Sequence, residues 1–260
     1  MYVYKILSEF LKREVTVELF IPNDAAKQEH RLELLILNDG QDTKQLNLLP
    51  TLQNVYADGQ MKPMVIAAVY ADKHRLDDYG VAAVLDSKRR GKSAKSYQLF
   101  LTRELIPYVL EKIHINAFQR IHIAGFSMGA LSAFDTAWKN DHLFYSAACF
   151  SGSFWWRSQD LHQGYNDAFH RIIHERVKQT LLKPRLKFWF QTGGQDEVTD
   201  RNANGLIDSI DDTNDLIGLL LDKGYRMFID IYYREVAEGK HNYETWGLVF
   251  PEYLVWLNYI

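Results

Sequence analysis

The chain has 260 residues, of which 47% are hydrophobic, and its formal net charge is −3. That length can bury one sizeable hydrophobic core, so a single domain over residues 1–260 is expected. Acidic and basic residues are interspersed, which argues against a nucleic-acid partner, and no apolar stretch approaches the about 20 residues of a membrane span. The first residues lack the charged and apolar regions of a signal peptide, so a cytoplasmic protein is expected, although a trimmed secreted form would look the same.

Along the chain, apolar patterns alternate between the two-residue period of strands and the 3.6-residue period of helices. Strands are expected, in order, at 15–22, 32–37, 64–70, 121–124, 144–150, 186–191 and 227–233. Helices are expected at 97–114, 130–138, 212–223 and 243–259, with a mostly helical cap insertion around 157–183. This alternation predicts an α/β fold with a mainly parallel central sheet flanked by helices.

The stretch Gly125-Phe126-Ser127-Met128-Gly129 lies between an expected strand and an expected helix. This is the G-x-S-x-G pattern in the strand–turn–helix context of a nucleophile elbow. Such a turn holds its serine in a strained conformation, and glycine neighbours let the strand and the helix pack closely. The pattern predicts Ser127 as the nucleophile of a serine hydrolase. Because the bare pattern also occurs by chance, the prediction needs partner residues.

A nucleophilic serine needs a base to accept its proton and an acid to orient that base. In α/β hydrolases the acid and then the base follow later strands. Asp196 follows the strand at 186–191 through a Gly-Gly turn, and His241 follows the strand at 227–233. We therefore predict Asp196 as the acid and His241 as the base, with Glu197 as the alternative acid.

The oxyanion of a tetrahedral intermediate needs two backbone N–H donors. One is expected from Met128, the residue after the nucleophile. The other is expected from Gln41, in the turn Asp39-Gly40-Gln41 that follows the strand at 32–37. Asp39, in the same turn, is predicted to contact the substrate. An ordinary Asp-Gly turn at a strand end is the alternative interpretation.

Six stretches match one family in the same order along nearly the whole chain. They are Leu37–Gln41, Phe100–Tyr108, Gly125–Ala130, Ser151–Trp155, Gly194–Glu197 and Gly239–His241. Through them the chain resembles the putative esterase family of α/β hydrolases. That family includes enterochelin esterases, S-formylglutathione hydrolases, feruloyl and acetyl-xylan esterases, and mycolyltransferases.

The resemblance implies an α/β-hydrolase fold and a serine esterase. It implies Ser127, Asp196 and His241 as the triad, and the N–H groups of Gln41 and Met128 as the oxyanion hole. It implies no particular substrate, because members act on very different acyl groups. Residues 75–79, Arg-Leu-Asp-Asp-Tyr, are similar to an Arg-x-x-Glu-Tyr stretch of the family, with Asp in place of Glu.

A second motif follows the predicted acid. Residues 200–211 read D-x-N-x-N-G-x-I-D-x-x-D, the spacing of an EF-hand-like calcium loop, with Asp at the last position as in dockerin modules. The predicted ligands are side-chain oxygens of Asp200, Asn202, Asn204, Asp208 and Asp211 and the carbonyl oxygen of Leu206. We predict a structural calcium ion that holds the segment carrying the acid, and no cofactor for catalysis. A turn without metal is the alternative.

Trp155 and Trp156 are predicted to wall an acyl or aryl pocket, with core packing as the alternative. The basic loop at 88–92 could face an acidic group of the substrate or be a solvated loop. The expected partner is a small-molecule ester, and a monomer or a homodimer is expected. Two other functions stay open: an acyltransferase that uses the same triad with a sugar or alcohol acceptor, and a catalytically silent, calcium-stabilised binding protein.

Overall fold

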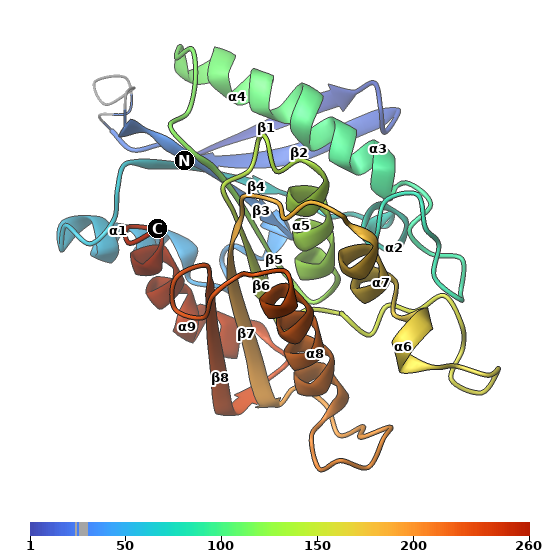
Figure 1. Ribbon diagram of the computed structural model, residues 1–260. Coiled ribbons are helices and arrows are strands. Elements are labelled where there is room, and N and C mark those ends of the chain that lie inside the picture. Colours follow the sequence, from blue (N-terminus) through green and yellow to red (C-terminus); the bar gives the residue numbers. More distant parts are fainter. Residues whose placement is uncertain (24, 26–30) are drawn as a thin grey trace.

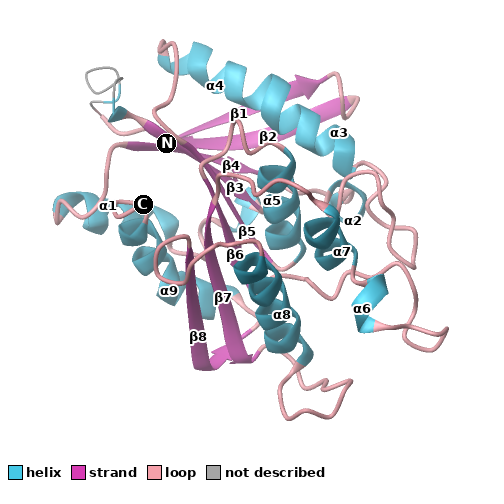
Figure 2. Ribbon diagram, in the orientation of Figure 1, coloured by secondary structure: helices cyan, strands magenta, loops and turns pink. Residues whose placement is uncertain are grey.

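The computed structural model describes residues 1–23, 25 and 31–260. Within these residues an eight-stranded sheet runs through the middle of the protein, with helices on both of its faces (Figures 1 and 2). The strands are β1 (Tyr2–Ser8), β2 (Arg13–Phe20), β3 (Glu33–Asn38), β4 (Met64–Val69), β5 (Ile121–Phe126), β6 (Ser146–Phe150), β7 (Lys187–Gln195) and β8 (Ile231–Lys240). The helices are α1 (Leu48–Ala57), α2 (Arg75–Asp78), α3 (Ala94–Leu99), α4 (Ile106–Ile113), α5 (Met128–Lys139), α6 (Asp167–His170), α7 (Ile172–Gln179), α8 (Asp208–Asp222) and α9 (Tyr243–Trp256). A 3-10 turn, η2 (Gly40–Asp42), follows β3, and a π-helical segment, η3 (Phe100–Leu105), joins α3 to α4.

The strand order across the sheet is β1-β2-β4-β3-β5-β6-β7-β8. Only β1–β2 and β2–β4 pair antiparallel; the other neighbouring strands are parallel. The predicted mainly parallel sheet with flanking helices is therefore confirmed. Because parallel strands end at the same edge of a sheet, the residues that follow β3, β5, β6, β7 and β8 gather along one edge.

The core lies on both faces of the sheet. In β3, Leu34 and Ile36 pack on one face, while Leu35 and Leu37 pack on the other. Helices α3, α4, α5, α7 and α8 cover the first face, and α1 and α9 cover the second (Figure 1). Burial on both faces explains why the central strands are uninterrupted apolar runs. Among the described helices, none is both long enough and apolar enough to cross a bilayer.

Several segments differ from the sequence-based expectation, among them helix α1, which was not expected. The edge strand β1 was not expected, because Tyr2, Val3 and Leu7 are exposed and hide the two-residue period. The strand expected at 227–233 instead runs from Ile231 to Lys240, since residues 226–230 form a turn in which Phe228 has a φ of 62°.

The expected cap at 157–183 is less helical than predicted. Only α6 and α7 are helical there, and they have 4 and 8 residues. Ile172, Ile173 and Val177 of α7 belong to the main core, so this helix is part of the body of the protein. Apolar spacing alone could not separate a helix that packs on the core from one that covers a site.

Strand β5 and helix α5 are in direct backbone contact. A Cβ atom added at Gly125 would lie 2.3 Å from the backbone carbonyl carbon and oxygen of Gly129. A Cβ atom added at Gly129 would lie 2.7 Å from Oδ2 of Asp39. Only residues without a Cβ allow this approach, which fixes the start of α5 against the carboxyl ends of β5 and β3.

We expect Gly125→Ala to lower the free energy of unfolding by about 3 kcal/mol, because the added methyl group must push the strand and helix backbones apart. The control is Gly218→Ala in α8, where an added Cβ meets no atom within 4 Å. It should raise the free energy of unfolding by about 0.5–1 kcal/mol through helix propensity. Denaturant unfolding measures both; equal stability of the two variants would contradict the close contact.

Candidate active site

Ser127 sits at the turn between β5 and α5. Its backbone has φ 55° and ψ −122°, a conformation that is costly for a residue with a side chain. Hydrogen bonds hold it there: its N–H donates to the Phe150 carbonyl at 2.9 Å, and its carbonyl accepts from Ser153 N–H at 3.1 Å. The predicted nucleophile therefore has the strained backbone that the G-x-S-x-G pattern leads one to expect.

Asp196 and His241 follow neighbouring strands at the same edge of the sheet. Gln195 of β7 pairs with Lys240 of β8, and the two predicted residues come directly after this pair. One oxygen of the Asp196 carboxylate, Oδ2, accepts the Gly193 N–H at 3.0 Å. The other, Oδ1, is buried and has no hydrogen-bond partner among the described residues.

The electrostatics of the two groups are linked. Burial raises the pKa of Asp196, although the Gly193 N–H, the Ser151 hydroxyl and the charge of His241 act to lower it. The ring of His241 packs against Trp246, and desolvation at this position lowers the pKa of its imidazole. The negative charges of Asp196 and Glu197 act in the opposite direction on His241. The carboxylates are therefore near enough to stabilise a protonated imidazole.

Trp246 connects the loop of His241 to the elbow strand. Its Nε1–H donates to Oγ of Ser151 at 2.9 Å. Its ring stacks on Phe126, with the centroids 5.1 Å apart, and meets the ring of His241 edge-on at 5.1 Å. One buried side chain thus holds three of the strand ends together.

Within the described part of the chain, no hydrogen bond joins His241 to Ser127 or to Asp196. The Ser127 hydroxyl instead lies 3.3 Å from Oγ of Ser153. Catalytic hydrogen bonds are often long before substrate binds. The sequence analysis did not predict this contact between Ser153 and Ser127, although Ser153 lies in one of the stretches that carry the family resemblance.

The loop after β3 packs against the start of α5. Asn38 Nδ2 donates to the Gly129 carbonyl at 2.8 Å, and Asp39 has the left-handed φ of 61°. The Gln41 side chain accepts from Ala71 N–H at 2.8 Å. The backbone N–H groups of Gln41 and Met128 form no hydrogen bond with other described residues. Two free donors therefore lie on segments that contact each other.

Asp39 is the first residue of this loop, and its side chain is buried. Arg75 binds its carboxylate in a bidentate manner, with Nε at 2.7 Å from Oδ1 and an Nη at 2.8 Å from Oδ2. The Asp39 N–H donates to the Tyr79 hydroxyl at 3.0 Å. The predicted substrate contact of Asp39 is therefore corrected. Its carboxylate is fully buried and paired with Arg75, so it stabilises the conformation of the loop.

The Asp that replaces Glu in the Arg-x-x-Glu-Tyr stretch is Asp78, and it pairs with Arg13 of β2. Burial raises the pKa of Asp78 to about 6 despite this guanidinium. The shorter side chain therefore joins α2 to β2, while Arg75 and Tyr79 support the loop after β3.

The two tryptophans differ. Trp156 is fully buried in the core, under the guanidinium of Arg90 at 4.6 Å, so it packs the interior and its predicted substrate contact is corrected. Trp155 is half-buried and lines a cavity of about 280 Å³. The sequence could not separate them, since adjacent residues in an irregular segment have no periodicity that tells which side chain faces the interior.

The predicted calcium loop is folded around its own side chains. Asp200 accepts the N–H groups of Asn204 at 3.1 Å and Gly205 at 2.9 Å, and Gly205 has a φ of 87°. Asn202 and Asn204 donate their amide groups to Asp211 at 2.8 and 2.9 Å. The loop leads into α8, which begins at Asp208.

The loop itself contains a cation, the guanidinium of Arg201, which lies near two of its carboxylates. Arg201 Nη1 is 3.1 Å from Asp208, and Nη2 is 3.8 Å from Asp211. In the described residues no three His, Cys, Asp or Glu side chains converge as a metal site. The donors, Leu206 included, have the oxygens that calcium prefers, but two of the three carboxylates already face the guanidinium. Calcium stays a prediction from the spacing.

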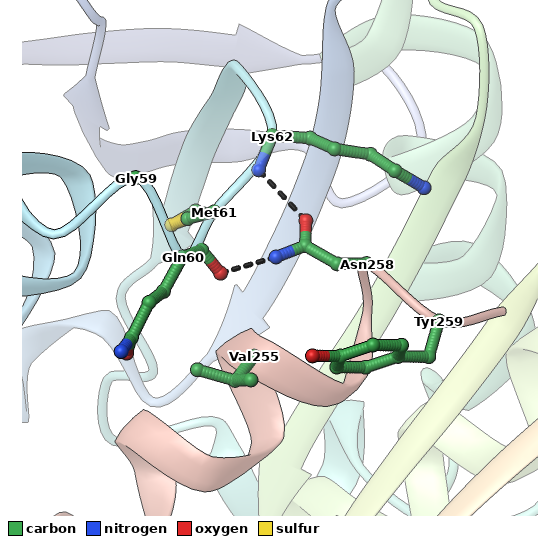
Figure 3. A pocket seen from close by; sticks show the side chains of 7 residues that line it. All are labelled: Gly59, Gln60, Met61, Lys62, Val255, Asn258 and Tyr259. Carbon is green, nitrogen blue, oxygen red and sulfur yellow. Dashed lines mark hydrogen bonds between the residues drawn. The ribbon is translucent and has the colours of Figure 1, made fainter.

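A larger cavity, of about 520 Å³, lies away from all of these residues (Figure 3). It is lined by residues 59–62 and by Val255, Asn258 and Tyr259. The Lys62 N–H donates to the Asn258 side chain at 2.8 Å across it. Since Lys62 precedes the first residue of β4, this cavity lies at the opposite edge of the sheet from Ser127, and size alone does not locate the site.

A mainly parallel sheet that presents a strained serine between strand and helix defines the class of protein as an α/β hydrolase. The chain belongs to the esterase family of this class: residues 8–257 match the family described as "Putative esterase". No curated protein matches the sequence.

Several solved structures are similar. Enterobactin esterase FES from Shigella flexneri, solved in the presence of enterobactin, has 21% identity and a TM-score of 0.75 and aligns with 100% of this chain. A ferulic acid esterase has 13% identity and a TM-score of 0.72, with 98% of this chain and 96% of that chain covered. An IroE-like serine hydrolase from Shewanella oneidensis has 16% identity and a TM-score of 0.67, with 98% and 78% covered. The chain spans 60% of the length of the enterobactin esterase, and these likenesses establish the fold.

The calcium prediction can be checked by thermal unfolding. At a calcium concentration about 100 times Kd, bound metal should add about 2.7 kcal/mol, so a chelator should lower Tm by about 5–10 °C. The esterase rate at 25 °C should change less. Asp200→Ala is the control that should remove the chelator effect. A wild-type melting curve that is the same with calcium and with chelator would rule out this loop as a calcium site.

Proposed function

We propose that the chain hydrolyses carboxylic esters through an acyl-enzyme intermediate on Ser127. The observation that carries this proposal is the β7–β8 register, which brings Asp196 and His241 to neighbouring strand ends at the edge where Ser127 stands. Membership of the esterase family agrees with the reaction class. The substrates named for the similar structures differ from one another, so they do not identify the substrate here.

In the proposed mechanism, Oγ of Ser127 attacks the ester carbonyl carbon and its proton passes to the neutral imidazole of His241. The C–O bond to the alcohol then breaks, and the alcohol leaves with the proton from the imidazolium. A water molecule attacks the acyl-enzyme by the same route, which releases the acid and restores the serine hydroxyl. His241 thus acts as base and then as acid in each half-reaction.

Asp196 orients the base in this proposal. Its Oδ2 is held by Gly193 N–H, and the Ser151 hydroxyl lies beside the carboxylate, which leaves the buried Oδ1 room to accept an N–H of the imidazole. That bond would place the other ring nitrogen towards the serine and would stabilise the imidazolium. Burial of the carboxylate strengthens its effect on the imidazolium, because solvent screens the pair less.

The N–H groups of Met128 and Gln41 would bind the oxyanion. Both are unpaired, and the Asn38–Gly129 hydrogen bond holds their two segments together. The buried Arg75–Asp39 ion pair and the side-chain bond of Gln41 to Ala71 keep the loop in this conformation before substrate arrives. Donors fixed in advance stabilise the transition state without reorganising during the reaction.

We expect a fluorophosphonate probe to label the wild type and not Ser127→Ala. A panel of esters with varied acyl length should be hydrolysed by the wild type, with kcat reduced by about 10⁵–10⁶ in Ser127→Ala, because the nucleophile is lost. Ser153→Ala is the matched control: it removes the neighbouring hydroxyl and should still be labelled. Labelling of Ser127→Ala at the wild-type rate would refute the assignment.

The pH profile tests the base and the acid together. The base must be neutral, and burial lowers the pKa of His241 below the ordinary 6.5, so kcat/KM should fall only as pH decreases through a value below 6.5. Glu197→Gln removes a charge that favours the imidazolium, so this acid limb should move to still lower pH.

Two variants complete that test. Glu238→Gln, in β8, is the control, and it should leave the acid limb of the pH profile unchanged. Asp196→Asn should reduce kcat by about 10⁴, because the imidazole loses its orienting group. If Glu197→Gln reduces kcat as strongly as Asp196→Asn does, Glu197 is the acid and the proposed assignment is wrong.

A further inference from the structure

A second cavity lies between two loops, one of which continues from Ser153. The loop that precedes α3 and the segment that precedes α6 lie side by side (Figure 1), joined by the Ser87 N–H, which donates to the Arg157 carbonyl at 2.8 Å. They enclose about 280 Å³, lined among others by Lys88, Arg90, Trp155 and Arg157. The sequence analysis left open whether this basic loop faces a ligand.

One of the cations that line this cavity is already neutralised. Asp86 is buried, and Arg90 binds its carboxylate with Nε at 2.7 Å and Nη2 at 2.5 Å. The same carboxylate accepts the backbone N–H groups of Lys88 and Arg90 at 3.1 and 2.7 Å. Asp86 therefore shapes the loop, and its charge is not available to the other cations.

Arg157 has no such partner. Among the described residues no carboxylate oxygen lies within 4.0 Å of its guanidinium, and its Nη1 is buried without a hydrogen bond. The guanidinium is held over the rings of Trp155 at 5.7 Å and Tyr165 at 5.2 Å. A buried guanidinium nitrogen without an acceptor is costly, so the arrangement favours an anion at this position.

The other charged residues that line the cavity also favour a bound anion. Lys88 is exposed at the mouth and forms no ion pair with the described residues, and His162 is exposed beside it. Asp160 is the one lining carboxylate besides Asp86 in the described chain, and it accepts the His162 N–H at 3.2 Å. Two unpaired cations thus face one carboxylate, which leaves the cavity positive.

The cavity is close to the nucleophile along the chain. Ser153 Oγ is 3.3 Å from Ser127 Oγ, and Arg157 is four residues further on. Four residues span at most about 14 Å between Cα atoms, so the backbone of Arg157 lies within that distance of the backbone of Ser153. An anion bound there would belong to a part of the substrate several bonds away from the ester.

We propose that this cavity is a subsite for a negatively charged, carboxylate-like group of the ester substrate, with Arg157 as its main ligand and Lys88 as a secondary cation. The proposal rests on the proposed esterase function and adds the substrate class: esters whose acyl or alcohol part carries an anionic group several bonds away from the carbonyl carbon. A guanidinium suits this role because its parallel N–H groups match a planar anion.

The test compares pairs of esters that differ only in a terminal carboxylate or carboxamide, in an acyl series and in an alcohol series of graded length. The wild type should favour the charged member of one series by about tenfold or more in kcat/KM, and added salt should weaken the preference. Arg157→Gln should bring the ratio near one, and Lys88→Gln should reduce it partly. Arg89→Gln, which removes an exposed charge from the same loop, should keep the ratio.

A binding measurement separates this inference from the proposed function. A half-amide of a dicarboxylic acid, which is not hydrolysed, is titrated by calorimetry into the wild type and Arg157→Gln. Binding that depends on Arg157, without turnover of any ester, would support the subsite and reject the esterase. Ester hydrolysis with no charge preference in either series, or with a preference that Arg157→Gln retains, would overturn the subsite and leave the esterase standing.

Discussion

The direct backbone contact between β5 and α5 is the constraint on which the candidate site depends. Because Gly125 and Gly129 have no Cβ, the helix starts immediately after the strand, and the chain must turn within a single residue. That residue is Ser127, which takes a positive φ of 55°. The same contact brings Gly129 against Asn38 and Asp39, so the loop after β3 is positioned by the elbow. The proposed nucleophile and the two proposed oxyanion donors therefore depend on one packing contact.

A second level of organisation joins the strand ends to one another. The β7–β8 register carries Asp196 and His241 to adjacent positions, and Trp246 ties the His241 loop to Ser151 and to Phe126 of the elbow strand. Two buried ion pairs stabilise the neighbouring segments. Arg75 with Asp39 supports the loop after β3, and Arg13 with Asp78 attaches α2 to β2. These pairs fix backbone positions, since each carboxylate is paired with its own guanidinium. The Arg157 guanidinium differs from these, because it lines a cavity and forms no ion pair with the described residues.

The sequence predicted the mainly parallel sheet, because most of its strands are apolar runs with a clear period. The sequence did not predict which polar and aromatic side chains are buried, because burial depends on the residues that pack around them. Asp39 and Trp156 lie in stretches typical of a binding site, yet both are fully buried. The loop at 200–211 has calcium-loop spacing, but Arg201, a position that the pattern leaves free, lies beside two of the predicted ligands. A spacing pattern specifies which residues can meet and does not say which other charges reach the same place.

By itself, the sequence determined the fold class and the strained turn at Ser127, and it set the chain order of the proposed nucleophile, acid and base, because these follow from local periodicity and from the steric demands of glycine. Only the tertiary structure decided which groups are neighbours. The pairing of Gln195 with Lys240, the contact of Ser153 with Ser127 and the isolation of the Arg157 guanidinium all join residues that are distant in the chain or in irregular segments. Such contacts are set by how strands register and how loops fold over the sheet edge, and no local pattern records them.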